Sequence, residues 1–306
     1  MSLKDRLLRA LPFSRQELEL LISTAPFRYK EYKIPKRKEG AFRLIAQPTP
    51  EVKLVQRWLV KNELSTLPIH SAAKAYKADT GLIENVIPHK NHRFLLKLDF
   101  ENFFPSITAS DFHQFMEDNG FSNTDIPTLI NLLFKRDHAT KSLRLAIGAP
   151  SSPTISNILL YPLDRALDNH CSDLAVSYTR YADDLSFSTN LPGILKDIEQ
   201  SVPALIKASC SLNLRINKNK TTHTSKKRGR RVTGLVITSE NEISVGRFRK
   251  RLLRAQIHHF GAGKLPPEET EALRGYLSFL NSVEPDQIDR LRIFYGKELM
   301  SRLMSR

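Results

Sequence analysis

The chain of 306 residues is long enough for two domains, or for one large body with an appendage, and for a sizeable buried core. Its 41% hydrophobic and 26% charged residues, with 12 Gly and 17 Pro, exclude a disordered, collagen-like or long coiled-coil protein. The two cysteines, Cys171 and Cys210, do not make a disulfide framework, and no apolar stretch approaches the roughly 20 residues that span a bilayer. We therefore expect a protein of a reducing cytoplasm with no membrane partner.

The positive charge is concentrated in one segment. The chain has 47 Lys and Arg against 32 Asp and Glu, a net charge of +15. Residues 207–254 contain 14 of the basic residues and only two acids, Glu240 and Glu242, which gives that segment a net charge of +12. A concentrated positive field suits a polyanion, either a nucleic acid or an anionic membrane surface. The alternative is a solvated basic face without a partner.

Hydrophobic spacing predicts mixed helices and strands in the first half of the chain. Ser14 is a suitable helix cap because Glu17 follows three residues later, and the N-terminus is typical of an amphipathic helix rather than a signal peptide. The predicted elements, in order, are helical structure (1–25), a hairpin (27–47), a helix (50–67), a buried strand (93–100) and a helix (102–119).

The second half continues this mixture and then becomes helical. We expect Pro162 to kink its helix. The predicted elements are a turn (144–153), a helix (154–170), a hairpin centred on 182–184 (175–188), a helix (194–209), short strands (214–216, 232–237, 243–245) and three helices (246–260, 267–283, 285–303). Mixed elements followed by a helical tail predict an α+β body with a helical C-terminal domain.

Three acids stand next to apolar strand residues. Asp99 ends the run 94–98, and Asp183 and Asp184 lie in the middle of the second predicted hairpin. If the two strands are neighbours, the carboxylates come within a few Å of one another and repel, and divalent cations relieve this repulsion. Oxygen ligands favour Mg²⁺, and two such ions suit phosphoryl transfer. The alternative is a pair of hydrogen-bonded structural turns.

Several segments together resemble the successive core blocks of reverse transcriptases. The resemblance is carried by RLIAQP (43–48), LKLDFENFFPSI (96–107), GAPSSPTISNILL (148–160), TRYADDLSFS (179–188) and NLRINKNKT (213–221). Within that family the chain resembles bacterial retron enzymes, through RRVTGLVI (230–237) and RGYLSFL (274–280). One departure from the retron pattern is Val86, where these enzymes often have Ala between Asn85 and His89.

The resemblance implies a right-hand polymerase fold with an antiparallel palm sheet. Residues 1–240 would form the fingers and palm, with the N-terminal helical extension 1–25, and residues 241–306 a helical thumb. The implied activity copies part of the enzyme's own structured non-coding RNA into DNA from dNTPs, with Mg²⁺ (two ions) or Mn²⁺ as cofactor. Synthesis would start from an RNA 2′-hydroxyl and give a branched RNA–DNA product (msDNA). The implied setting is the bacterial cytoplasm, in antiphage defence with an effector protein, and the bound partners include an RNA–DNA hybrid and single-stranded DNA.

The resemblance also assigns residues to the active site. Asp99, Asp183 and Asp184 are the expected catalytic and metal-binding residues, with the Phe100 carbonyl as a further metal ligand. Phe104 is expected to exclude a ribose 2′-hydroxyl, because an added hydroxyl against a packed ring must clash or lose its hydrogen bonds. The other expected nucleotide-binding residues are Arg43, Gly148, Ala149, Pro150 and Lys220, with Lys36 or Lys38 as helpers. The family often has Gln before the glycine, where this chain has Ile147.

RNA binding is expected over the basic segment and the first thumb helix. Basic side chains there would contact phosphates and give a salt-dependent affinity for RNA stems. The expected residues are Lys226, Lys227, Arg228, Arg230, Arg231, Val232, Thr233, Gly234, Arg247, Arg249, Lys250, Arg251 and Arg254. Two alternatives remain open at this point: another bacterial reverse transcriptase lineage, and a catalytically silent protein that binds RNA as a scaffold.

Overall fold

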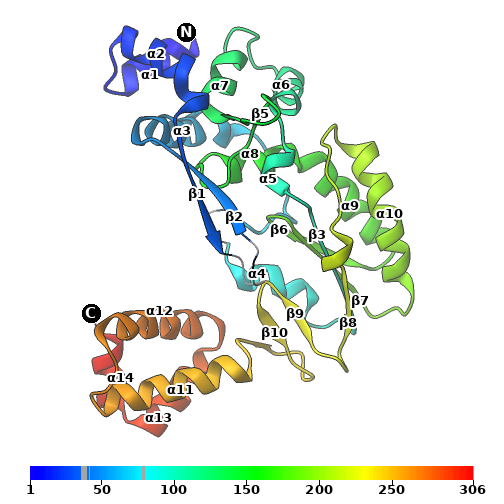
Figure 1. Ribbon diagram of the computed structural model, residues 1–306. Coiled ribbons are helices and arrows are strands. Elements are labelled where there is room, and N and C mark those ends of the chain that lie inside the picture. The colour runs from blue at the N-terminus through cyan, green and yellow to red at the C-terminus, as the bar shows by residue number, and fades with distance from the viewer. Residues whose placement is uncertain (36–39, 41, 78–79, 306) are drawn as a thin grey trace.

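The computed structural model describes residues 1–35, 40, 42–77 and 80–305, so Lys36 and Lys38 lie outside the described residues. A four-stranded antiparallel sheet, which we call the palm sheet, forms its centre, with strand order β6-β7-β3-β8. Its strands are β3 (Phe94–Asp99), β6 (Ser177–Tyr181), β7 (Asp184–Thr189) and β8 (Thr222–Ser225). Figure 1 shows the sheet in the middle of the body, with the N-terminal helices above it and the C-terminal helices as a separate bundle below.

One face of the palm sheet is apolar and covered by helices. Side chains alternate along each strand, so Leu96 and Leu98 of β3 share this face with Leu185 and Phe187 of β7 in the largest core. Figure 1 shows the covering helices α9 and α10 beside the sheet. The helices that contact the sheet are α9 (Tyr161–Asp173) and α10 (Ile194–Ser209), and α8 (Ser152–Leu159) packs on α9.

The same core holds a buried ion pair between a palm strand and α9. The Arg180 guanidinium donates to both carboxylate oxygens of Asp164 at 2.8 and 2.6 Å, and both side chains are fully buried. Asn157 accepts a further bond from Arg180. This fork geometry satisfies two charges that could not otherwise be buried.

The opposite face of the palm sheet is polar, and we call it the polar face. The register pairs Asp99 with Asp184 at one end, so Lys97 and Ser186 come next on the same face, and Ser188 lies further along. On β6 the same face carries Ser177, Thr179 and Tyr181. A short segment, with α4 (Leu82–Val86) and η3 (Ile87–His89), contacts β6 and β7.

Both edges of the palm sheet are short or occupied. At the β6 edge, Lys74 donates its backbone N–H to the Arg180 carbonyl, and Arg180 donates to the Ala72 carbonyl. At the other edge, β8 consists of four polar residues, Thr-His-Thr-Ser. Neither edge offers a long apolar strand.

The N-terminal half builds a helical layer and a projecting hairpin. The two strands of the hairpin pair in full register, from Tyr29 with Pro48 to Pro35 with Phe42. Ser14 forms the predicted capping box with Glu17. The elements are α1 (Leu3–Ala10), α2 (Arg15–Thr24), η1 (Ala25–Phe27), β1 (Tyr29–Pro35), β2 (Phe42–Pro48), α3 (Pro50–Asn62), η2 (Leu64–Thr66), α5 (Phe103–Ser106), α6 (Ala109–Asp118), α7 (Ile126–Leu133), β4 (Lys135–Arg136) and β5 (Leu143–Arg144).

The C-terminal part has a second hydrophobic core. Val232, Leu235 and Ile237 pack in it with thumb-helix residues such as Leu253 and Leu277, so the small sheet and the helices form one unit. The elements are η4 (Lys218–Lys220), β9 (Arg230–Val232), β10 (Leu235–Ile237), β11 (Ile243–Ser244), α11 (Arg247–Gly261), α12 (Pro267–Val283), α13 (Pro285–Tyr295) and α14 (Lys297–Met304). Among the helices of the described residues, none is both long and apolar enough to cross a lipid bilayer.

Several predicted elements are broken or displaced. Three long predicted helices break, at Ile107, at Leu160 before Pro162, and at Gly296, which has a φ of +86°. The strand predicted at 214–216 makes only an isolated bridge between Ile216 and Phe100, and the strand beside β3 is β8 instead. The strand predicted at 232–237 is a hairpin that turns at Thr233 and Gly234.

Candidate active site

Sheet register brings the three acids together at one end of the polar face. Asp99 is the last residue of β3 and Asp184 the first residue of β7, and the two are directly paired. Asp183 lies in the turn before β7, where its carbonyl accepts the Phe100 N–H at 3.0 Å. Ala182 in the same turn has a φ of +58°, a left-handed conformation that is uncommon for alanine. A strained tight turn therefore presents Asp183 beside Asp99.

The acids are partly desolvated and close enough to interact. Burial raises the pKa of Asp183, and the neighbouring Asp99 charge raises it further. Burial also raises the pKa of Asp184, while the Lys97 ammonium acts in the opposite direction. Lys97 Nζ lies 2.7 Å from Asp184 Oδ2, and Lys220 Nζ lies 2.7 Å from Asp99 Oδ1. Two ammonium groups thus offset the negative charge of this end of the sheet.

The donor chemistry of this end fits a hard divalent cation. The side-chain groups that could ligate a metal here are carboxylates, whose oxygens suit such a cation. Two of them, Asp184 and Asp99, already pair with lysine ammonium groups. In the described part of the chain, no three His, Cys, Asp or Glu side chains converge as a preformed metal cluster. Asp183 lines the cavity and interacts with the Asp99 charge, so these two carboxylates are the candidates to hold a cation there, although Lys220 contacts Asp99 as Lys97 contacts Asp184.

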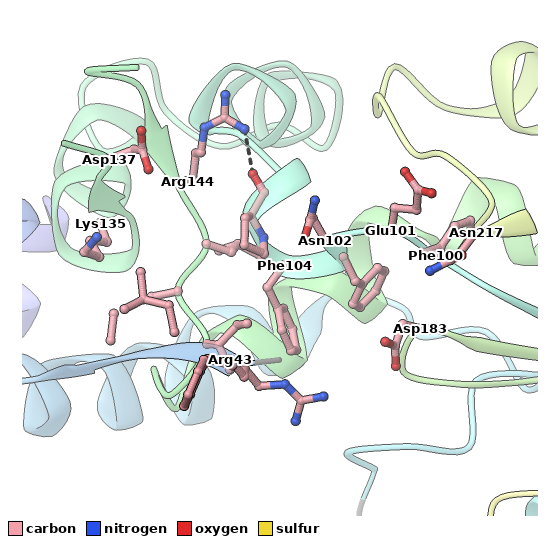
Figure 2. Close-up of a pocket in the computed structure, with 18 of the residues that line it drawn as sticks. Arg43, Phe100, Glu101, Asn102, Phe104, Lys135, Asp137, Arg144, Asp183 and Asn217 are labelled. Carbon is pink, nitrogen blue, oxygen red and sulfur yellow. Dashed lines mark hydrogen bonds between the residues drawn. The ribbon is translucent and has the colours of Figure 1, made fainter. Parts of the chain in front are cut away.

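A cavity of about 670 Å³ opens beside the acids, between the hairpin and the palm sheet. Its walls include Arg43 from β2, Phe104 from α5, Asp183 from the turn and Lys220 from η4. Figure 2 shows the Arg43 guanidinium, the Phe104 ring and the Asp183 carboxylate directed toward the same space. The structure therefore brings four of the predicted site residues to one cavity: Arg43, Phe104, Asp183 and Lys220.

The two neighbouring phenylalanines have different surroundings. Phe103 is buried and stacks on Phe100 with ring centroids 5.7 Å apart. Phe104 is half-buried, lines the cavity and lies 6.4 Å from the Tyr76 ring. Phe104, the predicted gate, is therefore at the cavity, and Phe103 is in the core.

The loop at 148–150 lines a different hollow from Arg43 and Phe104. Gly148 has a φ of +112°, and a Cβ at this position would lie 3.0 Å from Ile45 and 3.2 Å from the Ala46 carbonyl oxygen. Ala149 is buried against Ala46, and Gly148 and Pro150 line a separate hollow with Tyr32. The glycine is required for close packing against β2. The main cavity is lined instead by the preceding Ala146 and Ile147, so Ile147 supplies an apolar wall where the family often has an amide.

Three predicted RNA-binding residues have structural contacts that do not fit that prediction. Arg230 is buried, and its guanidinium donates to the carbonyls of Lys90, His92 and Thr238 and to Asn241 Oδ1. Val232 is fully buried in the second core. Lys250 Nζ pairs with Glu284 Oε2 at 2.5 Å.

The rest of the predicted RNA surface is accessible. Thr233 and Gly234, with φ values of +45° and +84°, form the tight turn between β9 and β10. Thr233 and Arg249 are half-buried. The exposed members are Lys226, Lys227, Arg228, Arg231, Gly234, Arg247, Arg251 and Arg254.

Sequence reasoning missed two residues at the site. Lys97 lies two residues before Asp99, so alternation along the strand places both side chains on the same face. It is also the one charged residue inside an apolar run. That signal could have identified it. Tyr76, 49% exposed and with a φ of +62°, lines the cavity from a loop without any pattern that predicts this.

Comparisons with known proteins agree with this geometry. The fold resembles that of a Candida albicans telomerase in complex with a telomeric RNA fragment, with a TM-score of 0.50 and 13% identity over 94% of this chain and 59% of that one. The antiparallel palm sheet and this likeness define a right-hand polymerase fold, with the acids at the end of the sheet.

The family is shown by sequence. Residues 34–237 match the family described as reverse transcriptase (RNA-dependent DNA polymerase). The Retron Ec83 reverse transcriptase of Escherichia coli is 36% identical over 94% of this chain and 93% of its own length, and the Retron Ec86 reverse transcriptase of the same species is 34% identical over 94% and 87%. The chain therefore belongs to the reverse transcriptase family, as a member similar to the retron enzymes, and is an RNA-directed DNA polymerase.

Proposed function

We propose that this enzyme copies part of its own structured non-coding RNA into DNA by nucleotidyl transfer at Asp99 and Asp183. The observation that carries this proposal is the pairing of Asp99 with the Asp183-Asp184 turn at the mouth of the Arg43 cavity. Two Mg²⁺ ions, or Mn²⁺ in their place, would supply charge stabilisation for the attacking and leaving oxygens when bound. Asp99, Asp183 and the Phe100 carbonyl would hold them, with Asp184 at the margin.

The residues around the cavity have separate tasks in this proposal. Arg43 binds the triphosphate, because its guanidinium forks onto phosphate oxygens. The Phe104 ring lies against the sugar and excludes a 2′-hydroxyl. Lys220 holds Asp99 in the free enzyme and neutralises the leaving pyrophosphate during turnover. Gly148, Ala149 and Pro150 form the loop that packs against β2. They affect the nucleotide only through the position of β2.

A primer-extension assay tests the chemistry. The enzyme is given an RNA template with a DNA primer, Mg²⁺ and dNTPs, and we expect DNA synthesis that Asp183→Asn abolishes. Asp173→Asn, an exposed acid at the end of α9, is the matched control and should retain activity. Extension by Asp183→Asn at the wild-type rate would contradict the assignment.

Retron-type priming is the finer part of the proposal. It is supported by the two retron relatives that match the chain over 94% of its length. The enzyme is expressed with its flanking DNA, and total nucleic acid is treated with ribonuclease and a debranching enzyme. We expect a short DNA whose size changes after debranching and which Asp183→Asn abolishes. Extension of a supplied primer without any branched product would keep the polymerase and exclude the 2′-hydroxyl priming.

The cellular role is a separate part of the proposal and has its own test. We propose that the branched product (msDNA) and an effector protein act with the enzyme in antiphage defence in the bacterial cytoplasm. Plating phages on cells that carry the complete locus should show protection that Asp183→Asn removes. Equal plating with and without the locus, across a broad phage panel, would contradict this role.

A further inference from the structure

A buried histidine bridges the two strands that hold the catalytic turn. His89 is fully buried on the polar face. Its Nδ1 lies 2.7 Å from Ser188 Oγ of β7, and its Nε2 lies 2.8 Å from Thr179 Oγ1 of β6. Thr179 precedes Asp183 by four residues, and Ser188 follows Asp184 by four residues. One imidazole therefore connects both arms of the hairpin whose turn carries the acids.

The hydrogen bonds assign the protons of this group. When Thr179 Oγ1 donates its single proton to the Asn85 carbonyl, which lies 3.4 Å away, it accepts from His89 Nε2–H. His89 Nδ1 then accepts from the Ser188 hydroxyl, and Ser188 Oγ accepts from His92 Nδ1–H at 2.7 Å. Burial lowers the pKa of His89 to about 3, so the ring stays neutral. The chain of bonds has a consistent direction throughout.

The same segment is fixed on its other side. The Arg230 guanidinium donates to the backbone carbonyls of Lys90 and His92, which follow His89 in the chain. Val86 packs in the second core with Val232 and Leu235. Residues 85–92 thus join the palm sheet to the small sheet at the base of the thumb.

Space filling alone does not explain His89. An apolar side chain of similar size would fill the volume without desolvating an imidazole. Instead, both ring nitrogens bond to strands about 90 and 99 residues away in sequence. Such bonds restrict the sliding and splaying of β6 against β7.

We propose that His89 is a positioning residue, which holds the β6 and β7 arms so that Asp183 stays in register with Asp99. The inference rests on the proposed nucleotidyl transfer at these acids. A displacement of about 1 Å in a reacting group can lower a rate by about 10²-fold, so a bond remote from the chemistry can control it. His89 itself touches neither substrate nor acid.

The test compares His89→Leu with His89→Gln. Gln has a carbonyl acceptor and an NH2 donor group, so it can replace the one acceptor and one donor of the neutral ring, whereas Leu offers neither. We expect His89→Leu to lower kcat for primer extension by about 10- to 100-fold, with the KM for dNTP changed by less than about twofold. His89→Gln should restore kcat to within about threefold of wild type.

Amide hydrogen exchange provides a readout apart from activity. In His89→Leu, exchange should rise in the peptide 179–188 and stay unchanged in α2 and α12. Leu21→Ala, a buried position in the N-terminal helical layer, controls for general loss of stability. His223→Leu controls for loss of an imidazole, since His223 pairs with Glu199 on the surface. Neither control should change exchange at 179–188.

The outcomes separate the inference from the proposed function. Equal losses in His89→Leu and His89→Gln, or unchanged exchange at 179–188 in His89→Leu, would overturn the positioning role. If His89→Leu does not fold, Thr179→Val and Ser188→Ala remove one bond each and should lower kcat by about three- to tenfold with the same exchange signature; wild-type values in both would overturn it. A wild-type enzyme that extends no primer would contradict the proposed function, while the exchange result would still report on the hairpin.

Discussion

The end of the polar face that carries Asp99 and Asp184 differs from the end that carries Thr179 and Ser188. At the first end, Asp99 and Asp184 are paired with lysine ammonium groups, and the adjoining Asp183 lines a cavity. At the second end, neutral hydroxyl and imidazole groups bond to one another in a closed network. Charge remains where cations and substrate can reach it, and neutral hydrogen bonds provide the rigidity, because buried charge without a partner is costly.

The largest expected effect is at the end of the polar face that carries the acids. Asp183→Asn should lower the primer-extension rate on the order of 10³-fold, because it removes one of the two carboxylates proposed to hold the cations that stabilise the reacting phosphate. The same change should raise the free energy of unfolding by about 1 kcal/mol, since it removes a desolvated carboxylate next to Asp99. Activity and urea denaturation of one preparation check both. A destabilised Asp183→Asn would show that the acid contributes to folding as well.

Buried His89, at the hydrogen-bonded end of the polar face, should make the free energy of unfolding depend on pH. The pKa of His89 is about 3 in the folded protein against an ordinary value of 6.5, so the unfolded chain binds more protons between these values. Stability from this group is therefore complete above pH 6.5 and falls as the pH falls, by about 2 kcal/mol at pH 5. Urea denaturation at pH 7 and pH 5 measures the loss.

His89→Gln isolates that contribution. Its amide does not titrate, so the loss between pH 7 and pH 5 should shrink by up to about 2 kcal/mol relative to wild type. The raised pKa values of Asp183 and Asp184 act with the opposite sign, because a folded state with raised carboxyl pKa values is favoured as the pH falls. These acids are present in both proteins and cancel in the difference. Identical pH profiles for the two proteins would refute a neutral buried His89.

The next prediction concerns Phe104, which lines the cavity beside the acids. Phe104→Ala should weaken discrimination between dNTP and rNTP by about tenfold or more, because the ring no longer excludes the 2′-hydroxyl. Phe104→Tyr is the matched variant and should keep the discrimination. Incorporation ratios with each nucleotide check this, and an unchanged ratio in Phe104→Ala would remove Phe104 as the gate.

The smallest expected effect concerns the lysine within the sheet. Lys97→Met keeps the side-chain length but leaves Asp184 without its ammonium partner, and both groups are largely covered. We expect a loss of about 1 kcal/mol in the free energy of unfolding. Lys141→Met, at an exposed turn, should change nothing. A Lys97→Met protein as stable as wild type would show that solvent alone compensates Asp184.

Local patterns predicted most elements near the site. The hairpin around 182–184 and the helix over 194–209 were predictable because alternation and helical spacing are strong there. Strand β8 was not, since Thr-His-Thr-Ser contains no apolar residue and an edge strand needs none. The breaks at Leu160 and Gly296 depend on where neighbouring helices pack, which spacing alone does not contain.

The candidate site was predictable through its motifs but not through its contacts. Motif matches identified Asp99, Asp183, Arg43 and Phe104, which the structure brings to one cavity or its rim. The basic run predicted Arg230 as an RNA contact, yet its guanidinium is used inside the protein. Charge counting cannot separate these cases, because partners 138 and 140 residues away decide whether an arginine is buried.

The two edges of the palm sheet have a consequence for the behaviour of the protein at high concentration. Open strand edges are where separate chains join into aggregates, and here segment 72–74 occupies one edge while a four-residue polar strand forms the other. We therefore expect copies of the enzyme that meet at high concentration not to pair edge to edge into intermolecular sheets.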